Sequence, residues 1–263
     1  MKENANKQYY RRYSVNIQVG DIRFSDEIEF DIKGTSIYFR SSKYEKWIEL
    51  CETIYFGEYC TRCSHPLHFH SSCRAHRPER EYLEKTVAIG VYYQTRYSRR
   101  NYLSDLILML KNSIYPALIL GAGIAYILDT KLSGLSVNDI DVITFVPKRE
   151  AEYKVDVDTG VRYNQSEILA KVVSNLCGIP IIPLAIKKFD FSLHGLPEEE
   201  RWRYALEGYD VANCDLLKKN TNVAIVDDVR TSGSTGNAIA KHLKEKCNIN
   251  KVYLLVAGRA YFI

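Results

Sequence analysis

Apolar and polar residues alternate along the first part of the chain. Residues 13–19, 22–32 and 36–41 place apolar side chains at about every second position and are rich in β-branched and aromatic residues. This period is typical of strands that bury one face and expose the other. The pattern predicts three short antiparallel strands, so residues 1–50 are interpreted as a β-rich N-terminal segment.

The pattern changes at about residue 87, where apolar segments typical of strands begin to alternate with amphipathic segments typical of helices. The predicted strands are residues 86–93, 141–147, 179–186, 222–228 and 251–260. The predicted helices are residues 100–111, 163–177, 197–207 and 234–247. Strands and helices repeated in this order favour a parallel sheet covered by helices on both faces. Residues 81–263 are therefore predicted to form one α/β domain.

The longest apolar run covers residues 114–128. It is shorter than the roughly 20 residues that a membrane span needs, and Pro116, Gly121 and Gly123 interrupt it. The run also contains a G-x-G element like that of a dinucleotide-binding fingerprint, but Tyr126 stands where the third glycine is needed. We interpret the run as core packing, and no association with a membrane is predicted.

Length and composition are those of a soluble globular protein. The chain has 263 residues, of which 26% are charged and 46% hydrophobic, which is ordinary for a globular protein with a sizeable core. A net charge of +4 is too small to indicate nucleic-acid binding by itself. Residues 1–14 lack the apolar core of a signal peptide, so the sequence predicts a cytoplasmic protein. Seven cysteines in such a protein argue against a disulfide framework.

Cysteines and histidines are concentrated in one polar stretch of the chain. Cys60 and Cys63 form a C-x2-C pair, and Cys73 and His76 form a C-x2-H pair further along. A two-residue spacing lets a tight turn aim both side chains at one ion, and four such ligands match a closed tetrahedral zinc site. The sequence therefore predicts structural Zn²⁺ in a zinc-ribbon-like module of residues 51–80.

Other ligand sets for this metal stay open. His65, His68 and His70 lie between the two pairs and could replace a ligand, and Cys51 is a more distant candidate. The alternative without metal is a set of scattered core cysteines and surface histidines. Four protein ligands would leave no position for water, so the predicted zinc is structural, and its module could also be a docking surface for nucleic acid or a partner protein.

Two adjacent acids follow the apolar segment 222–226. Asp227 and Asp228 stand where a parallel strand ends, the place at which α/β proteins bind ligands. The loop from Thr231 to Thr235 then offers hydroxyl groups, backbone N–H groups and a glycine before a predicted helix, whose N-terminus favours an anion. Carboxylates suit either Mg²⁺ or sugar hydroxyls. The pattern predicts a site for a phosphate carried on a sugar, and a polar turn with an ordinary helix cap is the alternative.

Residues 223–235, VAIVDDVRTSGST, resemble the phosphoribosyl-diphosphate (PRPP) signature of the type I phosphoribosyltransferases, an apolar strand followed by D-D-x-x-T-T/S-G-x-T. The resemblance implies the α/β fold of that family, with a parallel sheet, and Mg²⁺-dependent binding of PRPP. It also implies that Asp227 and Asp228 contact the ribose hydroxyls. The residues implied to hold the 5′-phosphate are Thr231, Ser232, Gly233, Ser234 and Thr235.

The order of the other segments is similar to that in the ComF branch, the competence-associated phosphoribosyltransferases. These segments are the Cys-rich stretch 60–76, LILMLK at 106–111, ITFVP at 143–147, RYNQSEILA at 162–170 and PEEERW at 197–202. The similarity covers roughly residues 58–260. The chain departs from the branch in having VRYNQ where RGFNQ is usual, and residues 1–50 match nothing in it.

The pyrophosphate of a bound PRPP would cross to the loop after another central strand. Lys148 and Arg149 occupy the loop that follows residues 141–147, and Arg162 and Gln165 precede the next predicted helix. These four side chains are candidate contacts for pyrophosphate oxygens. The alternative is that they are solvated loop charges and a helix cap.

Three hypotheses of function follow. The first is a Mg²⁺-dependent phosphoribosyltransferase that transfers ribose 5-phosphate to an unidentified nitrogenous acceptor. The second is a regulatory protein that binds PRPP or a nucleotide without turnover and is linked to DNA uptake or processing. The third is a nucleic-acid binder with a vestigial pocket, based on the zinc module and on the basic, tyrosine-containing segments 9–13 and 96–100. The intact acid pair argues against the third, and the first two predict the same ligand site.

Overall fold

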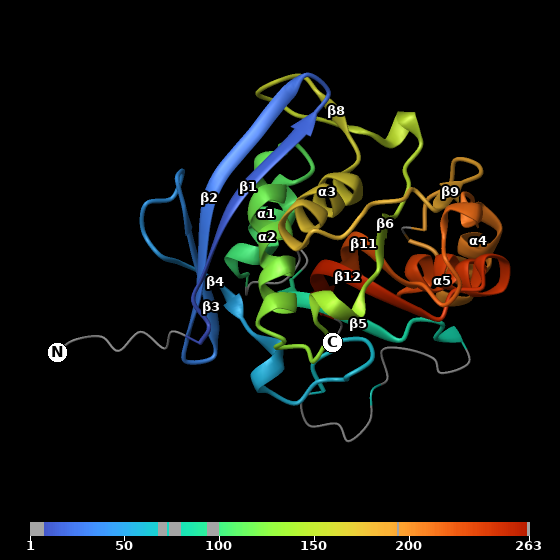
Figure 1. The fold of residues 1–263 in the computed structure, drawn as a ribbon, viewed down its shortest axis with the longest axis horizontal. Coiled ribbons are helices and arrows are strands. Elements are labelled where there is room, and N and C mark those ends of the chain that lie inside the picture. The colour runs from blue at the N-terminus through green and yellow to red at the C-terminus, as the bar shows by residue number, and fades with distance from the viewer. Residues whose placement is uncertain (1–7, 68–72, 74–79, 94–99, 194, 262–263) are drawn as a thin grey trace.

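The computed structural model describes residues 8–67, 73, 80–93, 100–193 and 195–261. An antiparallel sheet from the N-terminal part of the chain lies on one side of the molecule, a parallel sheet lies on the other, and helices lie between them (Figure 1). The protein is therefore a mixed α/β molecule with a β-rich N-terminal region. No helix of the described residues is long and apolar enough to span a membrane.

The N-terminal sheet contains four strands, each antiparallel to the next: β1 (Arg11–Val19), β2 (Ile22–Lys33), β3 (Ser36–Ser41) and β4 (Ile48–Glu52). The three strands expected from the alternating pattern are confirmed. Strand β4 is not predicted, because its five residues are too few to show a period. The buried face of the sheet joins the core of the α/β region, where Phe30 stacks on Tyr126 with ring centroids 5.2 Å apart.

The parallel sheet has the strand order β5 (Lys85–Tyr92), β12 (Lys251–Ala260), β11 (Asn222–Arg230) and β6 (Val142–Phe145). All three neighbouring pairs are parallel, as predicted. The apolar residues of these strands are buried in the core, which explains why the strands read as nearly continuous apolar runs in the sequence.

The prediction of a single strand at residues 179–186 is wrong. Only Ile181 bridges to the parallel sheet, through Ile143 of β6. The strand β9 (Ala185–Lys187) turns away and pairs antiparallel with β10 (Tyr209–Val211) in a separate sheet. The physical reason is the pair Pro180 and Pro183, which have no N–H group to donate to a strand ladder.

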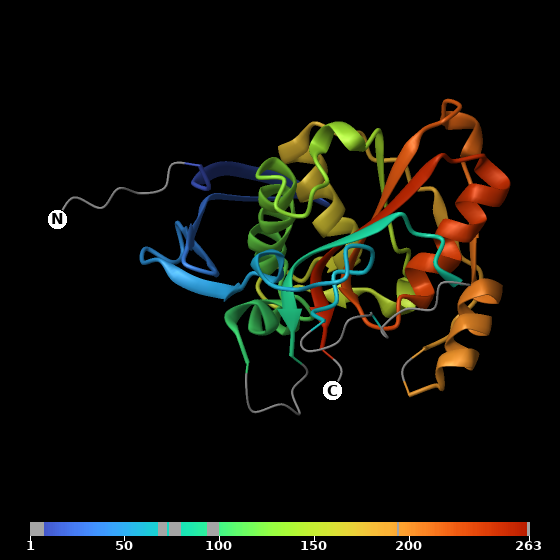
Figure 2. The ribbon, with the colours of Figure 1, turned by 90° about the horizontal axis from the view of Figure 1, so that it is seen from below.

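Five α-helices occur in the described residues: α1 (Tyr102–Met109), α2 (Tyr115–Asp129), α3 (Gln165–Cys177), α4 (Glu198–Gly208) and α5 (Ser234–Cys247). Short 3₁₀ helices are η1 (Ile54–Phe56), η3 (Val137–Asp139), η4 (Glu150–Glu152) and η5 (Cys214–Leu216), and two short strands, β7 (Lys154–Val155) and β8 (Arg162–Tyr163), pair antiparallel. The four predicted helices are confirmed. Helices α2 and α3 contact both sheets, whereas α5 lies on the other face of the parallel sheet (Figure 2).

The apolar run 114–128 is core packing, as predicted. It forms α2, whose residues from Pro116 to Leu128 are all buried. A Cβ atom on Gly121 would lie 2.5 Å from the Val172 side chain of α3. The glycine therefore lets the two helices approach closely, and it is not part of a dinucleotide site.

The chain changes direction at the neighbouring strands β6 and β11. It leaves β6 through α3 and returns beside β6 at Ile181, whereas it leaves β11 through α5 and returns on the opposite side as β12. Connections that depart in opposite directions open a crevice at the carboxyl ends of the two strands, which is the usual ligand site of open α/β sheets. The predicted acid pair and polar loop stand at this point.

One disulfide bond is present, although the sequence argues against a disulfide framework. Cys214 of η5 is bonded to Cys247 at the end of α5, with Cα atoms 5.0 Å apart, and the other five cysteines form no disulfide bond. The two positions are 33 residues apart in the chain, so their contact depends on how α5 packs and leaves no local signal in the sequence.

Candidate functional site

Asp227 lies in β11 at the crevice and is held there by α3. Its Oδ1 atom accepts a hydrogen bond of 2.7 Å from the hydroxyl of Ser166, in the first turn of that helix. Asn164 caps the helix by accepting from the backbone N–H of Ser166, and its amide donates to the carbonyl oxygen of Val146 beyond β6 at 3.0 Å. Ser166 and Asn164 thereby position the carboxylate between two strand ends.

The two predicted acids do not face the same way. Strand β11 continues through Arg230, so Asp227 and Asp228 are consecutive strand residues whose side chains point to opposite faces. Asp227 lines the crevice, whereas the carboxylate of Asp228 accepts from the N–H of Val229, and its charge adds to the burial that raises the pKa of Tyr92 in β5. The structure brings only the first acid to the polar loop.

Burial raises the pKa of Asp227 to about 7, and the negative charge of Asp228 adds to this effect. The positive charge of Lys148 acts in the opposite direction, and the hydrogen bond from Ser166 does so as well. A carboxylate that is costly to ionise without a partner is typical of a ligand site. The charge of Lys148 thus acts on the pKa of the Asp227 carboxyl group.

The predicted phosphate loop lines a cleft of about 440 Å³ together with Asp227, which is within the usual range for small-molecule sites. Helix α5 begins in this loop at Ser234 and has no acidic residue in its first turn. Its N-cap residue is Gly233, which has no side chain to accept hydrogen bonds from the first N–H groups of the helix. The first N–H groups of a helix have no partners within the helix, and the helix dipole adds positive potential there. The end of α5 in the cleft therefore suits an anion.

Gly233 has two reasons to be glycine. Its φ of +86° is in the left-handed region, which other residues rarely adopt. A Cβ atom at this position would also lie 2.8 Å from the guanidinium of Arg230 beneath the loop. The loop therefore keeps this conformation only with glycine at position 233.

The four candidate pyrophosphate contacts differ in their surroundings. Arg149 pairs with Asp190 at 3.0 Å and also donates to the carbonyl oxygen of Lys188. Arg162 donates to the carbonyl oxygen of Glu150, and Gln165 is buried in the first turn of α3. These three are engaged with the rest of the chain in this conformation, which leaves Lys148 as the predicted cation whose charge acts on Asp227.

Three residues of the site are not predicted. Ser166 directly follows the candidate residue Gln165, but nothing in the sequence shows that its hydroxyl reaches Asp227. Arg201 of α4 lines the cleft within a run of charges, where the sequence does not distinguish it from a solvated side chain. Tyr209 is buried, and burial raises its pKa with a contribution from the charge of Asp227, while an interaction with the Thr235 side chain lowers it.

Comparison with known proteins assigns no family to the chain. No protein-family model matches it, and no curated protein matches it significantly. The PRPP signature and the geometry of the cleft are therefore the grounds on which a function is proposed.

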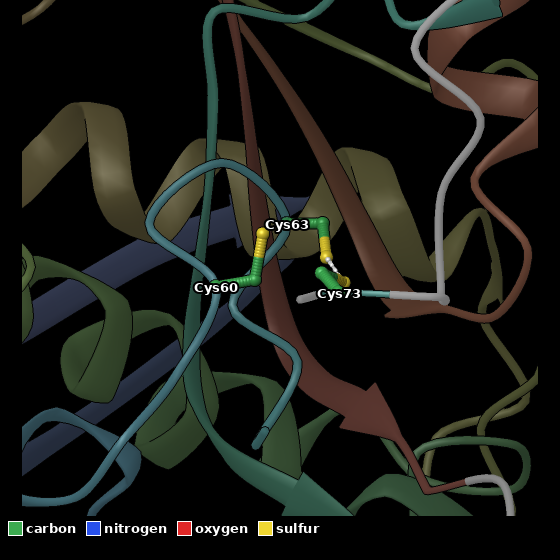
Figure 3. Close-up of side chains that lie close together, drawn as sticks. All are labelled: Cys60, Cys63 and Cys73. Carbon is green, nitrogen blue, oxygen red and sulfur yellow. Dashed lines mark hydrogen bonds between the residues drawn. The ribbon is translucent and has the colours of Figure 1, made fainter. Parts of the chain in front are cut away.

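Three of the four predicted zinc ligands lie close together. The sulfur atoms of Cys60, Cys63 and Cys73 all lie within 4.8 Å of one another, and those of Cys63 and Cys73 are 3.5 Å apart (Figure 3). A tetrahedral zinc site with Zn–S bonds of about 2.3 Å has sulfur atoms about 3.8 Å apart. The arrangement fits zinc, and we refer to these three residues as the cysteine cluster.

The fourth ligand is not assigned by the structure. His76 lies outside the described residues, as do His68 and His70. Among the residues described, no histidine or carboxylate joins the cysteine cluster, so His65 is not part of it. Cys51 is buried elsewhere, with its sulfur against the carbonyl oxygen of Ile89.

Hydrogen bonding within the cysteine cluster favours a thiolate. The side chain of Cys63 holds the pKa of Cys60 far below its usual range, at about 4, by donating a hydrogen bond to its sulfur. A thiolate is the form that binds metal, and Zn²⁺ binding would release the protons that remain on the three sulfur atoms.

We expect the purified protein to contain one equivalent of zinc per chain. Cys63→Ser should lose the metal and unfold at a lower temperature, because a structural zinc contributes about 10 kcal/mol to the folding of such a module. Cys177→Ser is the matched control, since Cys177 is a free cysteine of α3 outside the cluster. Metal analysis after metal-replete expression checks this, and clearly less than one equivalent in the wild type contradicts the assignment.

We also expect Asp227→Asn to stabilise the ligand-free protein at high pH. The pKa of Asp227, about 7 in the folded protein, lies above that of an unfolded chain, so the folded state binds this proton more tightly. The free energy of unfolding therefore falls as pH rises from about 4 to about 7. The asparagine side chain does not ionise, so the variant does not lose this free energy of unfolding as pH rises. The melting temperature of the variant relative to wild type should be higher at pH 8 than at pH 5, and an equal difference at both pH values argues against the raised pKa.

Proposed function

We propose that the protein is a Mg²⁺-dependent phosphoribosyltransferase of the ComF-like branch, with a type I phosphoribosyltransferase fold and a zinc-binding module before it. It binds PRPP and transfers ribose 5-phosphate to a nitrogenous acceptor. The observation that carries the proposal is the position of the PRPP signature, residues 223–235, at the carboxyl ends of β6 and β11 where the chain changes direction. This crevice is where an α/β sheet binds its ligand.

Each part of PRPP has a matching part of the cleft. The 5′-phosphate accepts hydrogen bonds from the loop Thr231–Thr235 at the N-terminus of α5. The carboxylate of Asp227 accepts from ribose hydroxyls, with Ser166 fixing its orientation. Lys148 offers a positive charge to the pyrophosphate on the opposite side of the crevice.

The reaction is displacement of pyrophosphate from C1 of the ribose by the acceptor nitrogen. Positive charge develops on the sugar as the C1–O bond breaks, so the protein contributes positioning, negative charge near the ribose and exclusion of water. Asp227 and Ser166 supply hard oxygen donors of the kind that would hold Mg²⁺. When bound, this ion would neutralise charge on the departing pyrophosphate.

A second candidate is a regulatory protein that binds PRPP or a nucleotide without turnover, with the zinc module as its contact to nucleic acid or a DNA-processing protein. One observation favours it. Arg149 and Arg162 are held by other parts of the chain in this conformation, so few cations on the pyrophosphate side of the crevice are available to a ligand. A cytoplasmic location is part of the proposal for either function.

Release of pyrophosphate distinguishes the two candidates. The zinc-loaded protein is incubated with PRPP, Mg²⁺ and a panel of purine, pyrimidine and other nitrogenous acceptors, and pyrophosphate is measured. If the protein is an enzyme, we expect pyrophosphate release that depends on one acceptor and is lost in Asp227→Asn. Tight binding of PRPP without release for any acceptor supports the regulatory protein.

A further inference from the structure

The guanidinium of Arg230 lies beneath the phosphate loop, residues 231–235. Arg230 ends β11, and its side chain is fully buried. A Cβ atom built on Gly233 would lie 2.8 Å from Nε, 2.8 Å from Nη2 and 2.9 Å from Cζ of this guanidinium. Nearly equal distances to three atoms of one planar group place Gly233 over its flat face. The loop thus packs on Arg230 at the residue from which α5 begins.

Glu81 holds the edge of this guanidinium. Its carboxylate oxygens accept from Nη2 of Arg230 at 2.9 Å and from Nη1 at 3.4 Å, and Nη1 also donates to the hydroxyl of Thr86. Both charged side chains of the pair are at most 1% exposed. Apolar side chains of similar size often stabilise a protein as well as a buried ion pair does, or better, so stability alone does not explain this pair. Its hydrogen bonds fix the plane of the guanidinium.

The segment that carries Glu81 also holds the start of α5. The side-chain oxygen of Asn237, in the first turns of that helix, accepts from the backbone N–H groups of the two residues after Glu81, at 2.8 and 3.2 Å. The side-chain amide of Asn237 donates to the carbonyl oxygen of Gly233 at 3.2 Å. This segment thus holds the loop from beneath, through Arg230, and from the helix, through Asn237.

Arg259 holds the first peptides of the loop. Its Nη1 atom donates to the carbonyl oxygens of Arg230, at 2.7 Å, and of Thr231. The described residues contain no cis peptide bond, and in a trans peptide the C=O and N–H groups point in opposite directions. The N–H groups of Thr231 and Ser232 therefore point away from Arg259. Two buried arginines thus support the loop backbone, Arg259 at its first peptides and Arg230 at Gly233.

The PRPP signature does not account for Arg230. Val229 and Arg230 fill the two open positions of D-D-x-x-T, so the resemblance to the type I phosphoribosyltransferases assigns no role to either residue. An open position of the signature does not require a charged side chain, and burying one is costly unless it is paired. The charge, burial and contacts of Arg230 are therefore features of this chain that call for their own explanation.

We propose that Arg230 is a positioning residue for the 5′-phosphate and that Glu81 fixes it in this role. The flat guanidinium supports Gly233 from beneath, and Glu81 and Thr86 keep its plane from turning. The N–H groups of the loop are then already in place for the phosphate, so binding requires less ordering of the backbone. That the loop binds phosphate rests on the proposed function, but the hold of Arg230 and Glu81 on the loop does not.

Replacing the ion pair with apolar side chains separates positioning from stability. The double variant Glu81→Leu/Arg230→Met keeps most of the buried volume but has a flexible side chain where the planar group was. It should melt at about the wild-type temperature or above it. We nevertheless expect the NMR order parameters of the ligand-free loop, residues 231–235, to fall from about 0.85 to about 0.6 or lower. Affinity for ribose 5-phosphate, measured by titration of the same labelled protein, should fall about tenfold or more.

The matched control is Arg12→Met/Glu27→Leu, which removes an exposed ion pair between β1 and β2 and should change neither the loop nor the binding of ribose 5-phosphate. Wild-type order parameters in the folded double variant at 81 and 230 overturn the proposal, even if ribose 5-phosphate binds more weakly, because Arg230 would then act on the phosphate directly. Lower order parameters with wild-type affinity for ribose 5-phosphate overturn it as well.

Should that double variant fail to fold, Arg230→Lys decides. Lysine keeps the charge but not the planar face, so the order parameters of the loop should again fall, and unchanged values overturn the proposal. Binding separates this proposal from the proposed function. Lower order parameters, with no binding of ribose 5-phosphate or PRPP to any of the proteins including wild type, support the hold of Arg230 on the loop and refute the function.

Discussion

Asp227→Asn should lower the affinity of the protein for PRPP by about 100-fold or more. Hydrogen bonds to a charged group contribute about 1.5–3 kcal/mol each, and a carboxylate that accepts from two ribose hydroxyls loses its charge and one of its two acceptor oxygens when it becomes an amide. The structure supports Asp227 as this group because it lines the cleft with the phosphate loop and is oriented by Ser166. Calorimetric titration with PRPP and Mg²⁺ measures the loss.

Asp228→Asn is the matched comparison for this prediction. The family signature treats the two acids alike, but here the carboxylate of Asp228 is turned toward Val229 and Tyr92. We therefore expect a clearly smaller loss of affinity in Asp228→Asn than in Asp227→Asn.

Undiminished PRPP affinity in a folded Asp227→Asn variant would refute the assignment of the ribose site.

Gly233→Ala should lower PRPP affinity by at least about tenfold and destabilise the protein. The added methyl group meets the Arg230 guanidinium at 2.8 Å, and Arg230 cannot move aside because Glu81 and Thr86 hold it. The loop must shift instead, and the N–H groups at the start of α5 shift with it. A left-handed φ adds about 1 kcal/mol of strain for alanine.

Gly20→Ala separates backbone strain from displacement of the loop. Gly20 also has a positive φ, +58°, but a methyl group added there would have no atom within 4 Å. Both variants should lower the free energy of unfolding by about 1 kcal/mol through backbone strain. Only Gly233→Ala should weaken PRPP binding. Equal PRPP affinities in the two variants argue against a phosphate site in this loop.

Most of the fold could be predicted because its strands and helices carry local patterns. Residues 251–260 form one buried strand and residues 234–247 one helix, as the apolar run and the amphipathic period indicate. The segment 179–186 reads as apolar but is broken by two prolines, and here the missing N–H groups outweigh the apolar pattern. Local apolarity does not specify which sheet a strand joins.

The candidate site could be predicted only where its residues are neighbours in sequence. Asp227 and the loop that follows are one continuous motif, and the structure keeps them together in one cleft. Ser166 reaches Asp227 from another helix, and Arg259 is an isolated charge in an apolar strand whose partners lie on distant segments. The opposite directions of Asp227 and Asp228 follow from the length of β11, which the sequence pattern does not define.

A structure of the protein with Zn²⁺, PRPP and Mg²⁺ would show whether the cleft is the PRPP site. We expect the 5′-phosphate at the N–H groups of Thr231–Thr235 and the ribose hydroxyls at Asp227. We also expect the pyrophosphate on the Lys148 side of the crevice between β6 and β11. PRPP bound with its 5′-phosphate at another surface, or no bound PRPP at millimolar concentration, contradicts this assignment of the site.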